Sequence, residues 1–98
     1  MPLDDEARLA VEKIVDEILK DPEVSLQAYS SGLMEVGIQP GLETILAFIA
    51  GMLYGIAGGI YAKKYNRIMT KEEFREFFDL LGRRAWELRR EFVNVFYR

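Results

Sequence analysis

The stretch TILAFIAGMLYGIAGGIYA, residues 44–62, decides the fold of this chain. It contains no charged residue, and glycine occupies positions 51, 55, 58 and 59. An uncharged apolar run of this length predicts a helix that is enclosed in a protein core or in a bilayer. We expect this helix to extend from about Pro40 to Asn66.

The small residues of this predicted helix fall on one face, because they lie within about 40° of one line at the helical repeat of 100° per residue. Large aliphatic residues lie on the opposite face. Each interior glycine costs about 1 kcal/mol relative to alanine, so close packing must offset the cost of four of them. We therefore expect a second helix, from this chain or from another copy, to pack closely on a face made of Ala47, Gly51, Gly55, Gly58 and Ala62.

Two helices are predicted before this stretch. Apolar residues recur with helical spacing from Asp4 to Lys20, which predicts an amphipathic helix with one buried face. Asp21 and Pro22 then form a helix-start signal for a weaker helix from about Pro22 to Val36. The residues Ser30, Ser31 and Gly32 could divide that helix into two pieces, and Gly37 is expected to end it.

A long final helix is predicted from Lys71 to the C-terminus. Thr70 and Glu73 have the spacing of a capping box, and only Gly82 interrupts an otherwise favourable helical sequence. Its apolar residues share one side of the helix and predict a long core stripe: Phe74, Phe77, Phe78, Leu81, Ala85, Leu88, Phe92, Val95 and Phe96.

These elements predict an all-α protein with one domain over residues 1–98, built as a three- or four-helix bundle around the glycine-rich central helix. Three covering elements can hardly surround a central helix on every side. We therefore expect oligomerisation to complete the bundle, most simply as a two-fold homodimer.

A membrane protein is the alternative interpretation. Nineteen uncharged residues suffice to cross a hydrocarbon layer of ~30 Å, and Lys63, Lys64 and Arg67 follow as a cytoplasmic stop signal. The large apolar residues contribute only roughly −2 to −4 kcal/mol to insertion, which makes a single-pass helix marginal. We favour a cytoplasmic helical oligomer and keep the single-pass membrane protein as the alternative.

Charge is distributed unevenly along the chain. Residues 1–62 carry three basic and ten acidic residues, whereas residues 63–98 carry ten basic and six acidic ones. This asymmetry predicts ion pairs between acidic and basic helices, or a basic C-terminal surface for nucleic acid or anionic lipid. Glu87 and Glu91 interrupt the basic run and the net charge is −3, so nucleic-acid binding is the less favoured interpretation.

A second apolar line on the final helix is a candidate partner patch. Trp86, Val93 and Tyr97 lie on one side with Arg83 and Arg90 beside them. Tryptophan and arginine are enriched in interface hot spots, and Arg90 one turn from Trp86 could form a cation–π pair. The same residues could instead pack within the chain or in a dimer core.

The sequence offers few parts for catalysis. Cysteine and histidine are both absent, which excludes thiolate and imidazole chemistry, and no cofactor or metal motif is present. Two acidic groups could hold Mg²⁺ only if helices faced one another, and we interpret them as solvated faces: Glu12, Asp16 and Glu17, and Glu72, Glu73 and Glu76. We therefore predict a non-enzymatic oligomerisation or adaptor protein, whose charged composition is typical of heat-loving sources.

Overall fold

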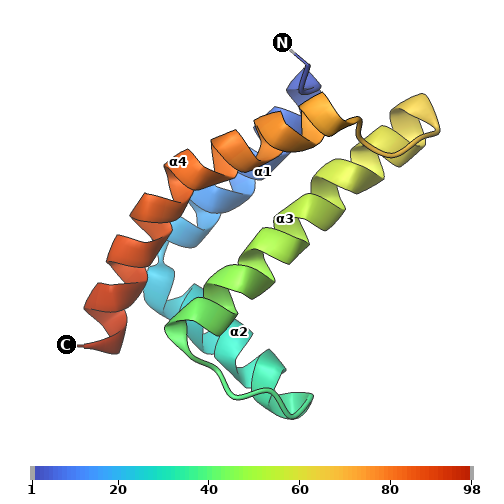
Figure 1. The fold of residues 1–98 in the computed structure, drawn as a ribbon. Coiled ribbons are helices and arrows are strands. Elements are labelled where there is room, and N and C mark those ends of the chain that lie inside the picture. The colour runs from blue at the N-terminus through green and yellow to red at the C-terminus, as the bar shows by residue number, and fades with distance from the viewer. Residues whose placement is uncertain (1, 98) are drawn as a thin grey trace.

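The computed structural model describes residues 2–97 and consists of four helices in that range (Figure 1). They are α1 (Asp5–Lys20), α2 (Pro22–Glu35), α3 (Leu42–Tyr65) and α4 (Lys71–Phe96). The molecule measures 42 × 26 × 19 Å. The helices α1 and α4 run in the same direction, α3 runs antiparallel to both, and α2 packs across the end where α3 begins (Figure 1).

Side-chain caps begin three of the helices, and the sequence indicated the caps of α2 and α4. The Asp4 carboxylate accepts a hydrogen bond from the Ala7 N–H, and Asp21 accepts one from the Val24 N–H in the same way. At α4 the capping box is complete, because the Thr70 hydroxyl accepts from the Glu73 N–H and the Glu73 carboxylate accepts from the Thr70 N–H. Each such cap satisfies a backbone donor that the helix itself leaves unpaired.

The helix α2 is continuous, as the predicted helix from about Pro22 to Val36 required, and the possible division at residues 30–32 does not occur. It ends at Glu35 and is followed by Gly37, whose φ of 81° lies in the left-handed region that favours glycine. The Ile38 N–H donates to the Leu33 carbonyl and the Gly37 N–H to the Met34 carbonyl, which is the Schellman arrangement. The serine and glycine residues do not break the helix, because the ordered C-terminus and packing against α4 hold it together.

The core lies where α1, α3 and α4 meet. From α3 it takes residues one turn apart along a single side: Ile45, Ile49, Leu53, Ala57 and Tyr61. Opposite them lie Ala7, Val11, Val15 and Ile18 of α1 and Phe77, Leu81, Leu88 and Phe92 of α4. Burial of each large apolar side chain contributes about 1.5–3 kcal/mol relative to leaving it in water.

The observed core stripe of α4 is rotated relative to the predicted one. Phe74, Phe78 and Phe96 were expected inside, but they are 43%, 45% and 39% exposed. Leu80 and Glu73 are buried instead. The rotation arises because α4 has to contact both α1 and α3, so that the side of α4 bearing Leu80 also belongs to the interior.

Ion pairs join the acidic and basic parts of the chain, as the charge asymmetry predicted. The Arg84 guanidinium of α4 donates to Glu12 and, at 2.6 Å, to Asp16 of α1. It also donates to Glu87 on its own helix at 2.6 Å, and these three carboxylates raise the pKa of Arg84 well above its usual range. The Arg84 side chain is only 18% exposed, so this cluster fixes the contact between α1 and α4.

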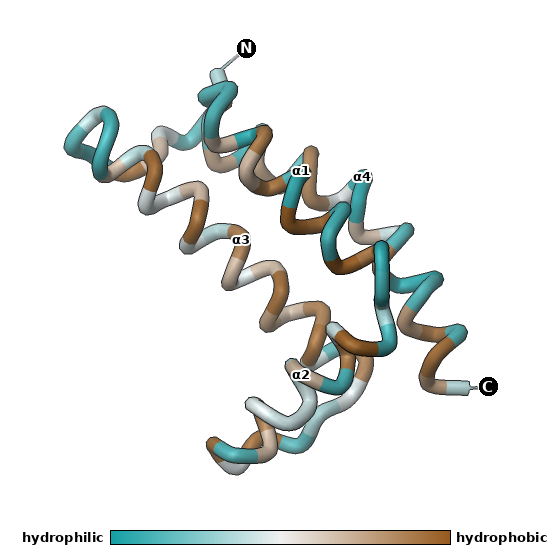
Figure 2. Tube along the Cα trace, turned by 180° about the vertical axis from the view of Figure 1, so that it is seen from behind, coloured by the Kyte–Doolittle hydropathy of each residue, from teal (hydrophilic) through white to brown (hydrophobic). Residues whose placement is uncertain are grey.

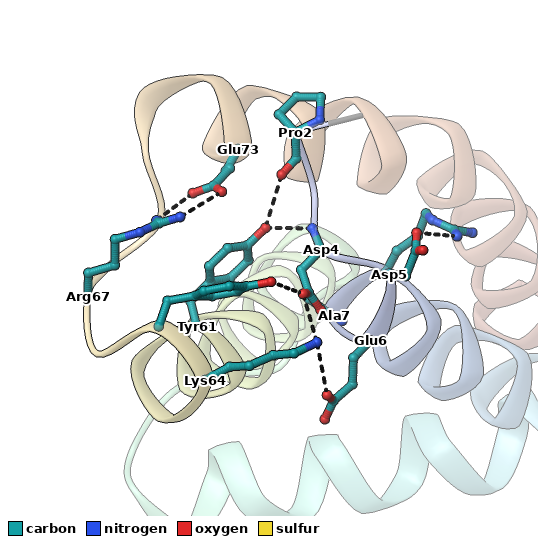
Figure 3. Close-up of polar contacts among 11 residues, drawn as sticks. Pro2, Asp4, Asp5, Glu6, Ala7, Tyr61, Lys64, Arg67 and Glu73 are labelled. Atoms are coloured by element: carbon teal, nitrogen blue, oxygen red, sulfur yellow. Dashed lines mark hydrogen bonds and ion pairs between the residues drawn. The ribbon is translucent and has the colours of Figure 1, made fainter.

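A hydrogen-bonded network ties the N-terminus to the end of α3 (Figure 3). The Asp4 N–H donates to the buried Tyr61 hydroxyl at 2.6 Å, and that hydroxyl donates to the Pro2 carbonyl at 3.4 Å. The Asp4 carboxylate accepts from the Tyr65 hydroxyl and, at 2.9 Å, from the Lys64 ammonium. These two donors hold the pKa of Asp4 well below its usual range.

A second carboxylate fixes the connection between α3 and α4. The Arg67 guanidinium donates to both oxygens of Glu73, at 2.8 and 3.1 Å, and lies over the rings of Tyr61 and Tyr65. With the Thr70 N–H as a further donor, Arg67 lowers the pKa of Glu73 from 4.5 to about 2. Bidentate pairing of this kind constrains geometry more than a single ion pair does.

Replacing Tyr61 by phenylalanine should isolate the hydroxyl contribution of the N-terminal network. The Asp4 N–H would lose its acceptor in a buried setting, so Tyr61→Phe should lower the free energy of unfolding by about 1–3 kcal/mol. Urea unfolding measures this free energy of unfolding for both proteins. Tyr97→Phe is the matched control, because Tyr97 is 78% exposed and its change should stay within about 0.5 kcal/mol. Equal effects of the two substitutions would contradict this role of Tyr61.

The lowered pKa values of Asp4 and Glu73 predict that the protein loses stability in acid. Both bind protons less readily in the folded protein than in the unfolded chain, so the stabilisation is complete above about pH 5 and falls progressively toward pH 2. Urea unfolding at a series of pH values should show this decline, and Glu73→Gln should make it shallower. A Glu73→Gln profile as steep as the wild-type one would show that Glu73 does not contribute.

Candidate functional site

The outer face of α3 is the most unusual surface of the molecule. We define it by seven residues that point away from α1 and α4: Ala47, Phe48, Gly51, Gly55, Gly58, Gly59 and Ala62. All are exposed except Gly58, which is partly buried. A Cβ atom added at any of the four glycines would meet no other part of the chain within 4 Å. The close helix partner expected for this face is therefore not supplied by the chain itself.

The other helices of a single chain do not enclose α3. The helices α1 and α4 lie next to one another on one side of α3, and α2 reaches only its beginning (Figure 1). As a result, 28% of the residues in the most apolar 18-residue window of α3 are buried. The tube in Figure 2 is mostly brown and pale along α3, with the hydrophilic colour concentrated at and just beyond its C-terminal end.

An aromatic cluster borders this face on the side of α4. The Tyr54 ring lies 5.5 Å from that of Phe74 and 5.8 Å from that of Phe77, and the Phe74 ring lies 4.8 Å from that of Phe78. Tyr54, Phe74 and Phe78 are each between one third and one half exposed. Part of the stripe that was predicted for the core thus extends the apolar surface of α3 onto α4.

A hollow borders the outer face on the side of α1. Its volume is about 580 Å³, and it is lined by Glu6, Gly55, Ile56, Gly59, Ile60, Lys63 and Lys64. The missing side chains of the two glycines create much of this space, since a larger residue at either position would project into it. Phe48 stands on the same α3 surface, 42% exposed, with its ring 5.4 Å from that of Tyr29 of α2.

Charged residues appear only at the two ends of the face. At the beginning of α3, Glu43 pairs with Arg89 of α4, which lowers the pKa of Glu43 below its usual value. At the other end lie Lys63 and Lys64, and Asp4 raises the pKa of Lys64. The face therefore runs from an acidic end to a basic end with no charge between them.

The candidate partner patch on α4 lies on a different side of the molecule. Trp86 and Tyr97 are 75% and 78% exposed, Arg83 and Arg90 are also exposed, and Val93 is partly buried. The cation–π pair that Arg90 could form with Trp86 is not present among residues 2–97, where Arg90 instead approaches Glu91 at 3.8 Å. Packing within the chain, one interpretation of this line, is thereby excluded for Trp86.

Most of the basic residues that could bind phosphates are already paired. Lys64, Arg67, Arg84 and Arg89 each contact a carboxylate. Within residues 2–97, no ion pair is found for Lys63 or Arg83. This arrangement gives little support to a surface that binds nucleic acid, which needs several available cations in one place.

The acidic groups considered for a metal are engaged elsewhere. Glu12 and Asp16 contact Arg84, and Glu73 contacts Arg67. Across the part of the chain that the structure describes, no group of three or more acidic residues is arranged to hold a metal ion.

Sequence reasoning identified the small residues of the outer face but missed Phe48, Tyr54 and Gly59 as parts of the same surface. Their signal was present in the helical repeat, because Phe48, Gly55 and Gly59 fall within about 40° of one line. Tyr54 lies on a flank of α3, and the sequence does not indicate which helix lies beside that flank. Because α4 lies beside that flank, Tyr54 forms the edge of the exposed surface.

The composition of α3 is also compatible with a helix that spans a membrane. Among the helices in residues 2–97, α3 alone is long and apolar enough to cross a bilayer. A helix in the core of a soluble protein can pass the same test, so this property is weak evidence.

Comparison with protein-family models, with curated proteins and with solved structures finds no match to this chain.

Proposed function

We propose that this protein is a non-enzymatic helical oligomerisation module, in which the outer face of α3 binds a second copy of the chain. One observation carries the proposal: a helix face without charge from Thr44 to Ala62 is exposed on a surface that is otherwise rich in charged residues. Continuous apolar patches of this kind on a soluble domain are typical of interaction surfaces.

The glycines favour a protein partner over lipid or water. Four interior glycines destabilise α3 by roughly 1 kcal/mol each relative to alanine, and nothing in the chain packs against them to offset this cost. Lipid tails gain little area from a glycine surface. A second helix can approach a glycine surface closely, so its backbone and side chains gain dispersion contacts that larger residues would prevent.

The arrangement of the other helices disfavours α3 as a membrane span. Both α1 and α4 run beside α3, and their outer sides carry charged residues such as Lys13, Asp16, Arg83 and Arg90. A bilayer deep enough to cover α3 would also have to cover these charges, at about 2.5–3.5 kcal/mol each on an insertion scale. A single-pass arrangement would therefore require α3 to separate from the helices that form its core.

An adaptor role would use the patch on α4. This patch has a large exposed apolar area, which Trp86 and Tyr97 provide. Beside it lies the cation of Arg83, which has no ion pair in residues 2–97. The patch therefore suits a protein partner with acidic residues around an apolar side chain. This patch lies away from the outer face of α3, so both contacts could exist at once.

Replacing Gly55 by leucine tests self-association directly. The wild-type protein, purified without detergent, should have twice its chain mass of 11.3 kDa by sedimentation equilibrium. The Gly55→Leu variant should be monomeric and still folded, because a Cβ atom at position 55 meets no other part of its own chain within 4 Å, whereas the leucine side chain would block close approach of another helix.

Gly82→Leu is the matched control. Gly82 is also an exposed helical glycine, and a Cβ atom added there would likewise meet nothing within 4 Å, but it lies on α4. This variant should keep the wild-type mass. A monomeric wild-type protein would refute the proposal, and recovery only from membranes would favour the single-pass alternative.

Trp86→Ala distinguishes the two surfaces. If the patch on α4 serves another protein, this substitution should leave both the oligomer mass and the free energy of unfolding unchanged to within about 0.5 kcal/mol, since Trp86 is 75% exposed. Dissociation of the oligomer by Trp86→Ala would instead place the patch in the contact between copies. Light scattering and urea unfolding measure the two quantities.

A further inference from the structure

We infer that the patch on α4 binds one acidic helix of another protein, which lies along the C-terminal half of α4 in the manner of a two-stranded coiled coil. This inference rests on the adaptor role proposed for the patch, not on self-association through α3, and it adds the kind of partner and its mode of docking. The patch consists of Arg83, Trp86, Arg90, Val93 and Tyr97.

The spacing of the patch indicates that its partner is a helix. The five residues follow one another at steps of three, four, three and four positions. This is the heptad spacing that keeps one line of side chains facing a second helix. The line extends for about 21 Å along α4 at the helical rise per residue, so a bound helix would run beside α4 for about four turns.

The side chains of the patch are available to a partner. Trp86 and Tyr97 are 75% and 78% exposed, and the Arg90 side chain is 71% exposed. Within residues 2–97, Arg83 has no ion pair, and Arg90 approaches a carboxylate only at 3.8 Å, that of its neighbour Glu91. An exposed pair at that distance contributes little, so both guanidinium groups can bind elsewhere.

The two arginines indicate that the partner is acidic. Arg83 and Arg90 lie two turns apart on either side of Trp86, in the line that a second helix would cover. Covering them removes water from two charges, which is costly unless carboxylates replace that water. Asp or Glu at the two facing positions can accept paired hydrogen bonds from each guanidinium, while an aliphatic residue between them covers the Trp86 ring.

Asp79 marks one end of this contact. It occupies the next position of the same spacing, four residues before Arg83, and it is exposed. Its carboxylate would repel an acidic helix. The contact is therefore confined to the part of α4 from Arg83 onward.

The arginines also disfavour a second copy of this chain as the partner. In a parallel pair, Arg83 would face Arg83 and Arg90 would face Arg90. In an antiparallel pair centred on the patch, Arg90 would again face itself. Like charges brought together in a covered contact are costly, and such repulsion is a common means of selecting a different partner.

The fluorescence of Trp86 tests the inference, because Trp86 is the only tryptophan of the chain. The probe is a synthetic helical peptide of three heptads with leucine and glutamate alternating along its seam. Its addition should shift the Trp86 emission to shorter wavelength in a saturable way, as the ring leaves water. The same peptide with lysine in place of glutamate should bind roughly tenfold more weakly, since its charges repel the two arginines.

Charge reversal identifies the residues that set this preference. The double variant Arg83→Glu/Arg90→Glu should bind the glutamate peptide roughly tenfold more weakly and should gain affinity for the lysine peptide. The matched control is Lys13→Glu/Lys71→Glu, which changes the net charge equally at two exposed cations that have no ion pair in residues 2–97. This control should keep the wild-type preference, and an equal loss in both double variants would overturn the inference.

The remaining outcomes separate this inference from the other proposals. Equal binding of the two peptides, or binding of neither, overturns it. An emission shift with vesicles of anionic phospholipid but not with the glutamate peptide would overturn it by placing the patch at a membrane surface. Sedimentation reports self-association independently, so a dimeric protein that binds neither peptide loses only the inference, and a monomeric protein that binds the glutamate peptide loses only the proposed self-association.

Discussion

The structure depends on the packing of one side of α3 against two neighbouring helices. That side supplies a line of buried residues from Ile45 to Tyr61, and α1 and α4 cover it from end to end. Two helices can cover only about half the circumference of a third. The apolar character of α3 extends around its whole circumference, so the fold of a single chain necessarily leaves apolar surface outside.

Ion pairs help to determine which helices pack together around α3. The acidic residues of α1 and the basic residues of α4 meet at Arg84, and the basic end of α3 meets the acidic beginning of α1 at Asp4. Each exposed pair contributes little, but a partly buried cluster with several hydrogen bonds also selects the neighbours and their register. The same pairing engages Lys64, Arg67, Arg84 and Arg89, which leaves fewer basic side chains available to bind phosphates.

The sequence alone predicted the helices and their caps well, because these depend on local chemistry. Thr70 with Glu73, Asp21 with Pro22, and Gly37 all occupy the positions that their types indicated. The rotation of each helix about its axis was harder to predict. Phe74 and Phe78 satisfy the helical repeat of a core stripe, but whether they lie inside depends on the direction from which α3 approaches α4. For the candidate site, the small face of α3 was predictable from spacing, whereas the hollow and the aromatic rim required the positions of α1 and α4.

The bond between Asp4 and Tyr61 has a consequence for how the molecule folds and opens. It joins residues 57 positions apart, whereas α3 and α4 are linked by a short connection and can pair at a much smaller entropic cost of loop closure. The pairing of α3 with α4 is therefore the more local step, and α1 docks by closing most of the chain into a loop. Detachment of α1 would uncover buried residues of α3 in addition to its exposed outer face. The hydrogen bonds of the N-terminal network oppose this opening, because it would break them and expose apolar surface.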